Sequence, residues 1–428
     1  MNNCPRSLPH PAGWASLVPI RAPTDTAQWL LALVLLLLLV GRNVFNKPVL
    51  AATLLAYLPL VVARGGRSAE LLLRCFSLAA LWILLVASYF WAVVPRVSLD
   101  MILTQSAFMA LALFIALRDQ AVGFASSLRL AAALLLPLVA LYCLLFPGAS
   151  VSTAGLNGFY LHKNNLGSIM AVCALALFYA PGRNKWHAAL GAVAVGLLAA
   201  SLSKTSIALF VTCGILLLAA DSWGNQVCSA PGKPPTKREV RLTLHILVLL
   251  GLVALVLFRD ELLDLLWANL PKTALTGRGT LWLAVMQQMR VHSLLGIGPG
   301  AFWLAGDASE IAQTSLYRMD SQWVQRMVSA DGSYVDMVAA LGFLGLALFL
   351  LTSVDLYRRL FRNWLQPDSR LVFVLATFVL LHAITESTLL YSTNILWLIY
   401  LLCYFRVASH PSPDSMAGQQ NRRGWRCW

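Results

Sequence analysis

The chain has 428 residues, of which 59% are hydrophobic and only 12% are charged. Because soluble domains carry about 25% charged residues, this composition excludes an ordinary soluble domain and indicates lipid as the main solvent. The net charge of +14 is compatible with nucleic-acid binding or with basic loops that orient a membrane protein. No CxxC pair occurs among the eight cysteines, so we expect neither a disulfide framework nor a zinc site.

Apolar runs that are long enough, or nearly long enough, to cross a bilayer recur along the whole chain. Some are shorter than the about 20 residues that an isolated helix needs, so we expect their ends to extend into flanking polar residues. The predicted fold is an all-α polytopic membrane protein with about twelve transmembrane helices. The predicted spans are 28–41, 48–63, 71–94, 99–117, 128–146, 166–181, 187–202, 205–220, 242–258, 334–354, 371–387 and 389–405.

Basic residues are distributed unevenly over the loops between these spans. Twelve spans place both termini on one side; with cytoplasmic termini, twenty Lys and Arg lie in inside segments and five in short outside loops. The positive-inside rule describes such an asymmetry. We therefore predict a multi-pass protein of a bacterial-type inner membrane, with both termini cytoplasmic. Because the positive charge is dispersed over these loops, nucleic acid is not an expected partner.

One loop, residues 259–333, is far longer than the others and falls on the outer side. Two of its segments, 280–292 and 310–329, have apolar residues at helical spacing, which is typical of helices that lie at an interface or cover a cavity. A glycine-rich turn at 296–300 separates them. The chain thus divides into helices one to nine, the outer loop, helices ten to twelve and a cytoplasmic tail, with these ranges: 1–258, 259–333, 334–405 and 406–428.

Three cations lie on the predicted outer face, where the positive-inside rule does not expect them. Lys163 precedes span six, Lys204 lies between spans seven and eight, and Arg278 precedes the first loop helix. Cations and hydroxyls gathered near one membrane surface suit a diphosphate group. Each cation also has a plainer interpretation. Lys163 can extend its amine to the interface, Lys204 can be a turn residue, and Arg278 can cap a carbonyl or pair with an acid.

Five short motifs follow one another along 155–350. They are His162-Lys163-Asn164-Asn165, Ser203-Lys204-Thr205, Thr276-Gly277-Arg278, Gly300-Ala301-Phe302-Trp303 and the segment 330–336. Their order resembles the O-antigen ligase and polymerase superfamily, and its exopolysaccharide-polymerase branch in particular. That resemblance implies a fold similar to the C-type glycosyltransferases, with a hydrophobic groove for a polyprenyl chain. It also implies inverting, metal-independent transfer of a glycan from undecaprenyl diphosphate at the periplasmic face.

The resemblance also implies roles for individual residues. Lys204 and Arg278 match the cations that grip the diphosphate, where fixed positive charge stabilises the leaving group. Neither a cofactor nor a metal is expected, and no DxD pair is present to bind a metal. Glu386, an acid in an apolar run, is costly unless paired; it can hold Arg278 or Lys204, face a cavity or lie at a wet helix end. The expected substrate-binding residues are His162, Lys163, Asn164, Ser203, Thr205 and Glu386.

The segment 330–336 departs from the family pattern at the position of the expected catalytic histidine. Family members resemble AHNGYLD there, whereas this chain has Asp331 in place of the histidine. Asp331 can act as the base that activates the acceptor hydroxyl, or it can cap the helix that follows. Asp336, Glu386 and His162 are the other candidate bases.

Four functions remain open from the sequence. The first is a polymerase that joins lipid-linked repeat units into an exopolysaccharide or O-antigen. The second is an O-antigen ligase, which differs in using lipid A-core as the acceptor. The third is a twelve-helix transporter, which the scarcity of ionisable residues in the spans disfavours. The fourth is a binding or scaffold member without catalysis. The expected partners are a lipid-linked glycan donor, a glycan or lipid A-core acceptor and membrane lipid.

Overall fold

The computed structural model describes residues 26–40, 65–118, 123–153, 155–229, 278–304, 309–314, 327–390 and 394–409. Within these ranges the protein is mostly helical, with four helices long and apolar enough to cross a membrane and five shorter apolar helices. An all-α membrane protein is compatible with this architecture. The predicted spans 48–63 and 242–258 lie outside the described residues, so the number of twelve crossings stays a prediction.

The helices and strands follow the chain in a simple order, and the two strands pair as an antiparallel hairpin. The elements are α1 (Thr26–Val40), α3 (Gly65–Arg74), α4 (Phe76–Ala87), η2 (Ser88–Trp91), α5 (Pro95–Arg118), α6 (Phe124–Leu145), α7 (Pro147–Ser150), β1 (Val151–Ser152), β2 (Gly155–Leu156), α8 (Lys163–Tyr179), α9 (Lys185–Ala200), α10 (Lys204–Ser229), α13 (Arg278–Gln288), η5 (Glu310–Gln313), α16 (Ser333–Arg362), α17 (Ser369–Thr385) and α18 (Ile395–Ser409).

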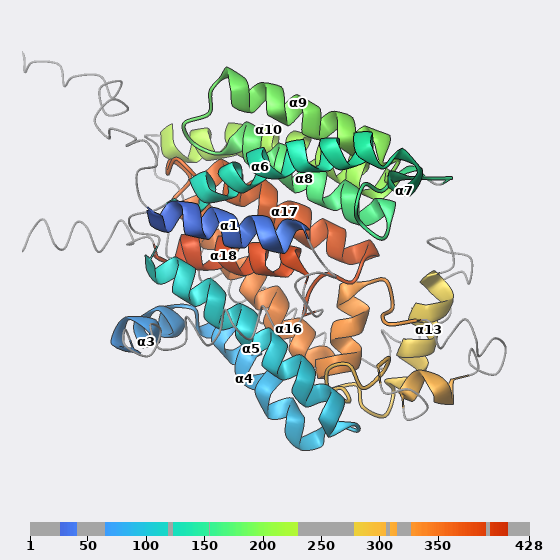
Figure 1. The fold of residues 1–428 in the computed structure, drawn as a ribbon. Coiled ribbons are helices and arrows are strands. Elements are labelled where there is room, and N and C mark those ends of the chain that lie inside the picture. The colour runs from blue at the N-terminus through green and yellow to red at the C-terminus, as the bar shows by residue number, and fades with distance from the viewer. Residues whose placement is uncertain are drawn as a thin grey trace, which may run out of the picture.

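Three helices, α8, α17 and α18, form the buried centre of the bundle. Every residue of α8 from Leu166 to Leu177 is buried, and α17 is buried from Leu371 to Val379. A helix that is apolar on all sides is typical of such a position. Figure 1 shows α17 and α18 between the group of α6, α8, α9 and α10 and the group of α4, α5 and α16. This centre fixes how the ends of α8, α10, α16 and α17 meet.

The predicted span 71–94 is wrong as a single helix. Helix α3 ends at Arg74, Cys75 forms a turn, and α4 begins at Phe76. Arg74 therefore does not lie inside a span. It is about half exposed and pairs with Glu70, one turn earlier, at 2.6 Å. The prediction failed for a local reason: α3 carries glycine and charged residues at its start, and only its later part is apolar.

The break predicted at 202–205 is present as a tight turn between α9 and α10. Leu202 has a φ of 52°, and the Ser201 hydroxyl donates to Leu198 O at 2.6 Å while accepting from the Ser203 N–H. Helix α8 packs directly on this turn. A Cβ added to Gly167 would lie 2.6 Å from Ser203 Cβ, so the glycine permits the close approach of α8 to the start of α10.

Helix α16, predicted as 334–354, extends to Arg362 and is interrupted at Gly342, whose φ is 67°. The segment 293–298 lies in the break. The N–H groups of Ile297 and Gly298 donate to the carbonyls of Ala339 and Ala340, while the N–H groups of residues 343 and 344 donate to the carbonyls of residues 293 and 294. The freed backbone groups are thus paired inside the protein, as broken helices in membranes require. The outer loop is thereby anchored to the first part of α16.

The two ends of the bundle carry different charge clusters. The starts of α8, α10 and α16 meet the end of α17, as the side-chain contacts described below require. At the opposite end, Asp355 pairs with Arg358 and Arg359, each at 2.7 Å, and Arg370 pairs with Asp221 at 2.9 Å. Arg358, Arg359 and Arg370, which are among the basic residues predicted on the inside, therefore lie at the end remote from Lys163, Lys204 and Arg278.

Candidate functional site

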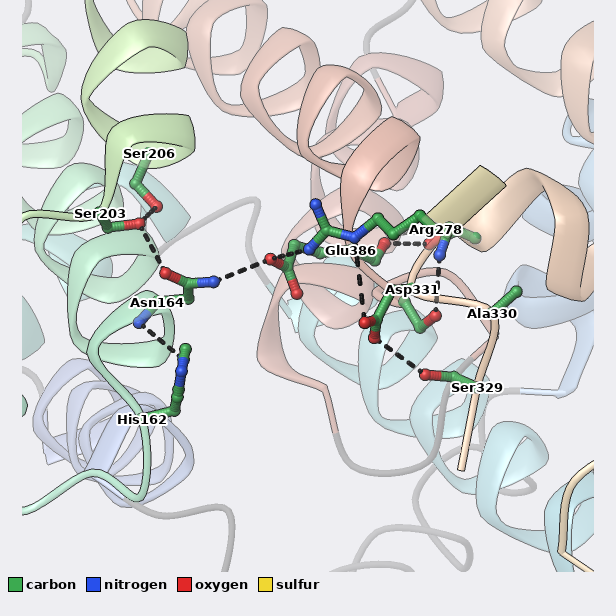
Figure 2. A network of polar contacts seen from close by, with 12 residues as sticks. His162, Asn164, Ser203, Ser206, Arg278, Ser329, Ala330, Asp331 and Glu386 are labelled. Atoms are coloured by element: carbon green, nitrogen blue, oxygen red, sulfur yellow. Dashed lines mark hydrogen bonds and ion pairs between the residues drawn. The ribbon is translucent and has the colours of Figure 1, made fainter. Parts of the chain in front are cut away.

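A continuous chain of polar side chains joins the start of α10 to the end of α17 (Figure 2). The Ser203 hydroxyl lies 3.0 Å from the Ser206 hydroxyl and 3.2 Å from Asn164 Oδ1. The Asn164 amide then donates to Glu386 Oε1 at 3.0 Å. Ser203 is buried, and Asn164 lies in the first turn of α8. The amide of Asn164 therefore connects the pair of Ser203 and Ser206 to Glu386, which lies 222 residues after Asn164 in the sequence.

The chain continues from Glu386 through Arg278 to Asp331. Arg278 Nη2 lies 3.0 Å from Glu386 Oε1, and Arg278 Nε lies 3.9 Å from Asp331 Oδ2. The side chains of Arg278 and Glu386 are 18% and 21% exposed, whereas that of Asp331 is 47% exposed. Asp331 is thus the carboxylate that a ligand from outside can reach, and Glu386 is the inner support of the guanidinium.

The apolar neighbours of Glu386 predict that it lies within a span. In the structure it lies directly after α17, which ends at Thr385. Burial raises the pKa of Glu386, while the charge of Arg278 opposes that rise. Its backbone carbonyl accepts from the Ser333 hydroxyl at 2.8 Å. Of the arrangements considered for Glu386, the structure has the one in which it pairs with Arg278, since no contact joins it to Lys204 within the described chain.

Asp331 does not cap α16. Gly332 takes the N-cap position, and the Asp331 side chain instead lies near Arg278 and accepts from the Ser329 hydroxyl at 3.4 Å. Asp331 has a φ of 49°, in the left-handed region. Asp and Asn adopt this region more readily than other non-glycine residues, although less readily than glycine, so contacts of the neighbouring residues favour this conformation.

His162 caps α8 rather than contacting the acids. Its Nδ1 accepts from the Asn164 N–H at 3.2 Å, and its side chain is exposed. Lys163 is half-buried at the first residue of α8, and Thr205 is half-buried in the first turn of α10. Lys204 is exposed at the first residue of α10, next to Ser203, and makes no hydrogen bond or ion pair with another described residue. The structure therefore does not join Lys204 to Arg278.

The predicted loop helices are found in part. Arg278 begins α13, as the segment 280–292 predicts with slightly different bounds. The segment 310–329 contains only the short η5 in its described part, and 315–326 lies outside the described residues. Beside α16, a small pocket that is partly open to solvent has a mainly apolar lining that includes Leu85, Met101, Phe302 and Leu389, with Asp336 as its acid.

Three residues of this region have no role in the sequence analysis. Ser206 lies on α10, one turn after Ser203, and is hydrogen-bonded to it. The spacing of the two serines at a predicted helix start is the sequence signal that could have identified Ser206. Ser387 follows Glu386 in a run of hydroxyl residues and contacts Asp336. His382 is buried one turn before Glu386, and neither ring nitrogen has a partner in the described chain. No sequence pattern distinguishes His382 from a packing residue.

Comparison with known proteins does not extend this description. No protein-family model matches the chain, and no curated protein matches it either. Among the described residues, no group of three or more His, Cys, Asp or Glu side chains could hold a metal ion.

Proposed function

We propose that the protein transfers a glycan from an undecaprenyl-diphosphate carrier to an acceptor hydroxyl at the periplasmic face, acting as a polymerase of lipid-linked repeat units. The observation that carries this proposal is that motif segments far apart in the sequence meet in one polar chain. Asn164, Ser203, Arg278 and Asp331 come from four separate motifs and are linked through Glu386. A guanidinium that is fixed where the ends of several helices meet suits the recognition of a diphosphate.

In the proposed reaction the acceptor oxygen attacks the anomeric carbon from the face opposite the diphosphate. The bond between that carbon and the diphosphate oxygen breaks, and the diphosphate leaves with the electron pair. The proton of the acceptor hydroxyl passes to the carboxylate of Asp331. Arg278, already oriented by Glu386, stabilises the charge that develops on the leaving group without further reorganisation. Lys204 adds a second cation from the start of α10.

The exposures of the two carboxylates support this division of roles. Asp331, at 47%, is open to an acceptor from outside, while Glu386, at 21%, is enclosed and already accepts from Asn164 and Arg278. A base must reach the proton that it removes. Asp331 meets this requirement better than Glu386, and the His162 ring is used to cap α8.

The test is to incubate the purified protein in proteoliposomes with lipid-linked repeat units, with and without a lipid A-core acceptor. We expect a ladder of elongated lipid-linked products without the core. We expect Arg278→Ala to lower the rate of glycan transfer at least about 100-fold, as the loss of a hydrogen bond that stabilises the transition state does. The variant should still insert into the membrane. A product linked only to the core would show the ligase, and no product with either acceptor would contradict glycan transfer.

A further inference from the structure

Asp336, in the first turn of α16, binds three donors with its two carboxylate oxygens. Its Oδ1 accepts from the Ala330 N–H and from the Trp303 indole N–H, each at 2.9 Å. Its Oδ2 accepts from the Ser387 hydroxyl. Each Asp336 oxygen therefore accepts at least one hydrogen bond, whereas the contacts of the two Asp331 oxygens are longer, at 3.4 Å and 3.9 Å. Asp336 is thus less available than Asp331 to accept a proton.

These bonds reach residues next to both site acids. Ala330 directly precedes Asp331, and Ser387 directly follows Glu386. The Gly332 N–H, which follows Asp331, donates to Ser387 Oγ at 3.2 Å. Asp336 and Ser387 together thus hold the backbone before and after Asp331 and connect it to the residue next to Glu386.

The same loop is tied to the helix that carries Arg278. The Trp282 indole N–H, from the first turn and a half of α13, donates to the carbonyl of Ala330 at 2.9 Å. Gly332 packs closely on that indole, since a Cβ added there would lie 2.8 Å from Trp282 Cζ2. Ala330 is therefore fixed through both its N–H and its carbonyl, once by Asp336 and once by the helix of Arg278.

The backbone of Asp331 explains why such anchoring is needed. Its φ of 49° lies in the left-handed region, and a non-glycine residue stays there only when its surroundings determine the conformation. The contacts that surround it are those of Ala330 and Gly332, and they lead to Asp336 directly or through Ser387.

We infer that Asp336 is a positioning residue, which holds the strained Asp331 loop so that its carboxylate faces Arg278. This inference rests on the transfer reaction proposed above. It also assigns a role to Trp303 of the glycine-rich turn, whose indole N–H binds Asp336 and so connects the outer loop to the same anchor. What Asp336 supplies is a hydrogen-bond acceptor of fixed position, and its negative charge is not required.

The kinetic test compares Asp336→Ala with Asp336→Asn. Asparagine keeps an acceptor for Ala330 and Trp303 and can donate its amide to Ser387, whereas alanine leaves buried donors unpaired. We expect kcat to fall at least about 100-fold in Asp336→Ala, since a misplacement of about 1 Å costs that much, and less than about 5-fold in Asp336→Asn. In an Asp331→Asn background, Asp336→Ala should lower kcat little further, because the effects of substitutions at residues that act together are not additive.

A second readout does not depend on activity. Ser329 is buried beside Asp331, so a Ser329→Cys thiol should react slowly with a membrane-impermeant maleimide, followed by mass spectrometry of its own peptide. We expect fast labelling when Asp336→Ala is added, and slow labelling with Asp336→Asn. Ser353→Ala is the matched control, because Ser353 lies farther along α16 and binds Tyr400; it should leave the labelling slow.

Two outcomes would overturn the inference. If Asp336→Asn is as inactive as Asp336→Ala while labelling stays slow in both, the carboxylate has a chemical role. If Asp336→Ala is fully active and slowly labelled, the loop needs no anchor. If instead the unaltered protein transfers no glycan but the labelling follows the expected order, the proposed function fails and the positioning of the Asp331 loop by Asp336 stands.

Discussion

The ion pair of Arg278 and Glu386 lies at the centre of the polar chain. Both side chains are largely enclosed, and Nη2 of the guanidinium is bound at 3.0 Å. Removing one partner of such a pair leaves an uncompensated charge, which costs about 1–3 kcal/mol when the group is partly buried. The guanidinium has five N–H donors in a planar fork, so donors remain for a phosphate while Glu386 fixes the orientation.

Lys204 is exposed at the start of α10 and makes no hydrogen bond or ion pair with another described residue, so its proposed role depends on a bound ligand. We expect Lys204→Ala to lower kcat/KM for the lipid-linked donor about 10-fold, chiefly through KM, as the loss of one charged phosphate contact does. The measurement is the initial rate of glycan transfer over a range of donor concentrations.

The matched control for this variant is Lys185→Ala. Lys185 is also an exposed lysine at the first residue of a helix, but α9 begins at the other end of the bundle. Its ammonium lies 5.9 Å from the Trp186 ring and away from the polar chain. Equal losses of kcat/KM in the two variants would contradict a specific role for Lys204 in binding the diphosphate.

At the scale of an element, the interruption of α16 matters more than its length. The segment 293–298 pairs with the backbone at the break, so this segment and the first part of α16 form one hydrogen-bonded unit. This unit carries the glycine-rich turn, Trp303 and the residues that anchor Asp331. The site is therefore built on a broken helix whose free backbone groups are satisfied by a neighbouring loop.

Gly342 is the position at which this arrangement is most sensitive. A Cβ there would lie 2.1 Å from Leu294 O, and the φ of 67° is unfavourable for other residues. We expect Gly342→Ala to lower the free energy of unfolding by about 2 kcal/mol or more. The midpoint of heat-induced aggregation in detergent should fall by at least about 4 °C, as measured by size-exclusion chromatography after heating.

Gly214→Ala is the control for that variant. Gly214 lies inside α10, and a Cβ there meets nothing within 4 Å. Alanine is the better helix former by about 1 kcal/mol, so the midpoint should stay the same or rise. A fall of similar size in both variants would mean that the break in α16 has no special sensitivity.

At the scale of the whole molecule, the protein has two chemically distinct ends. One end holds the polar chain around Arg278. The other holds the cluster of Asp355 with Arg358 and Arg359, and Arg370 with Asp221. The Arg359 guanidinium also donates to the backbone of Arg74 at 2.6 Å, which ties α16 to α3. The two charge clusters therefore lie at opposite ends of α16 and α17.

This separation predicts opposite accessibilities for two leucines. Leu161 lies just before α8 and is 73% exposed, and Leu365 lies between α16 and α17 and is 74% exposed. We expect a membrane-impermeant maleimide to label Leu161→Cys in cells with a permeable outer envelope, since the positive-inside rule places that end outside. Leu365→Cys should be labelled only after the inner membrane is opened. The reverse order would invert the predicted topology and remove the site from the periplasm.

Much of the helical pattern could be predicted from the sequence. Apolar runs determine where α5, α6, α8 and α9 lie, because helix formation in lipid depends on local composition. The ends were less predictable, since α3 and α4 separate at Cys75 and α16 continues past its apolar run. Turns and breaks depend on contacts with other segments, which composition does not contain.

Four members of the polar chain could be predicted from the sequence, whereas its connections could not. Short motifs identify Asn164, Ser203, Arg278 and Asp331 as polar residues near helix starts. They do not show that Glu386, 108 residues from Arg278, is the inner partner of its guanidinium. They also allowed Asp331 to cap the helix that follows, whereas Gly332 takes the N-cap position of α16.

The sequence by itself determined that this is an apolar, helical chain with basic residues sorted between loops and with cations at three helix starts. Those properties are local, since they follow from composition and spacing. Only the tertiary structure decided that Arg278 pairs with Glu386, that Lys204 stands apart and that Asp336 holds the Asp331 loop. These contacts depend on how the buried helices α8, α17 and α18 pack, and packing is a property of segments far apart in the chain.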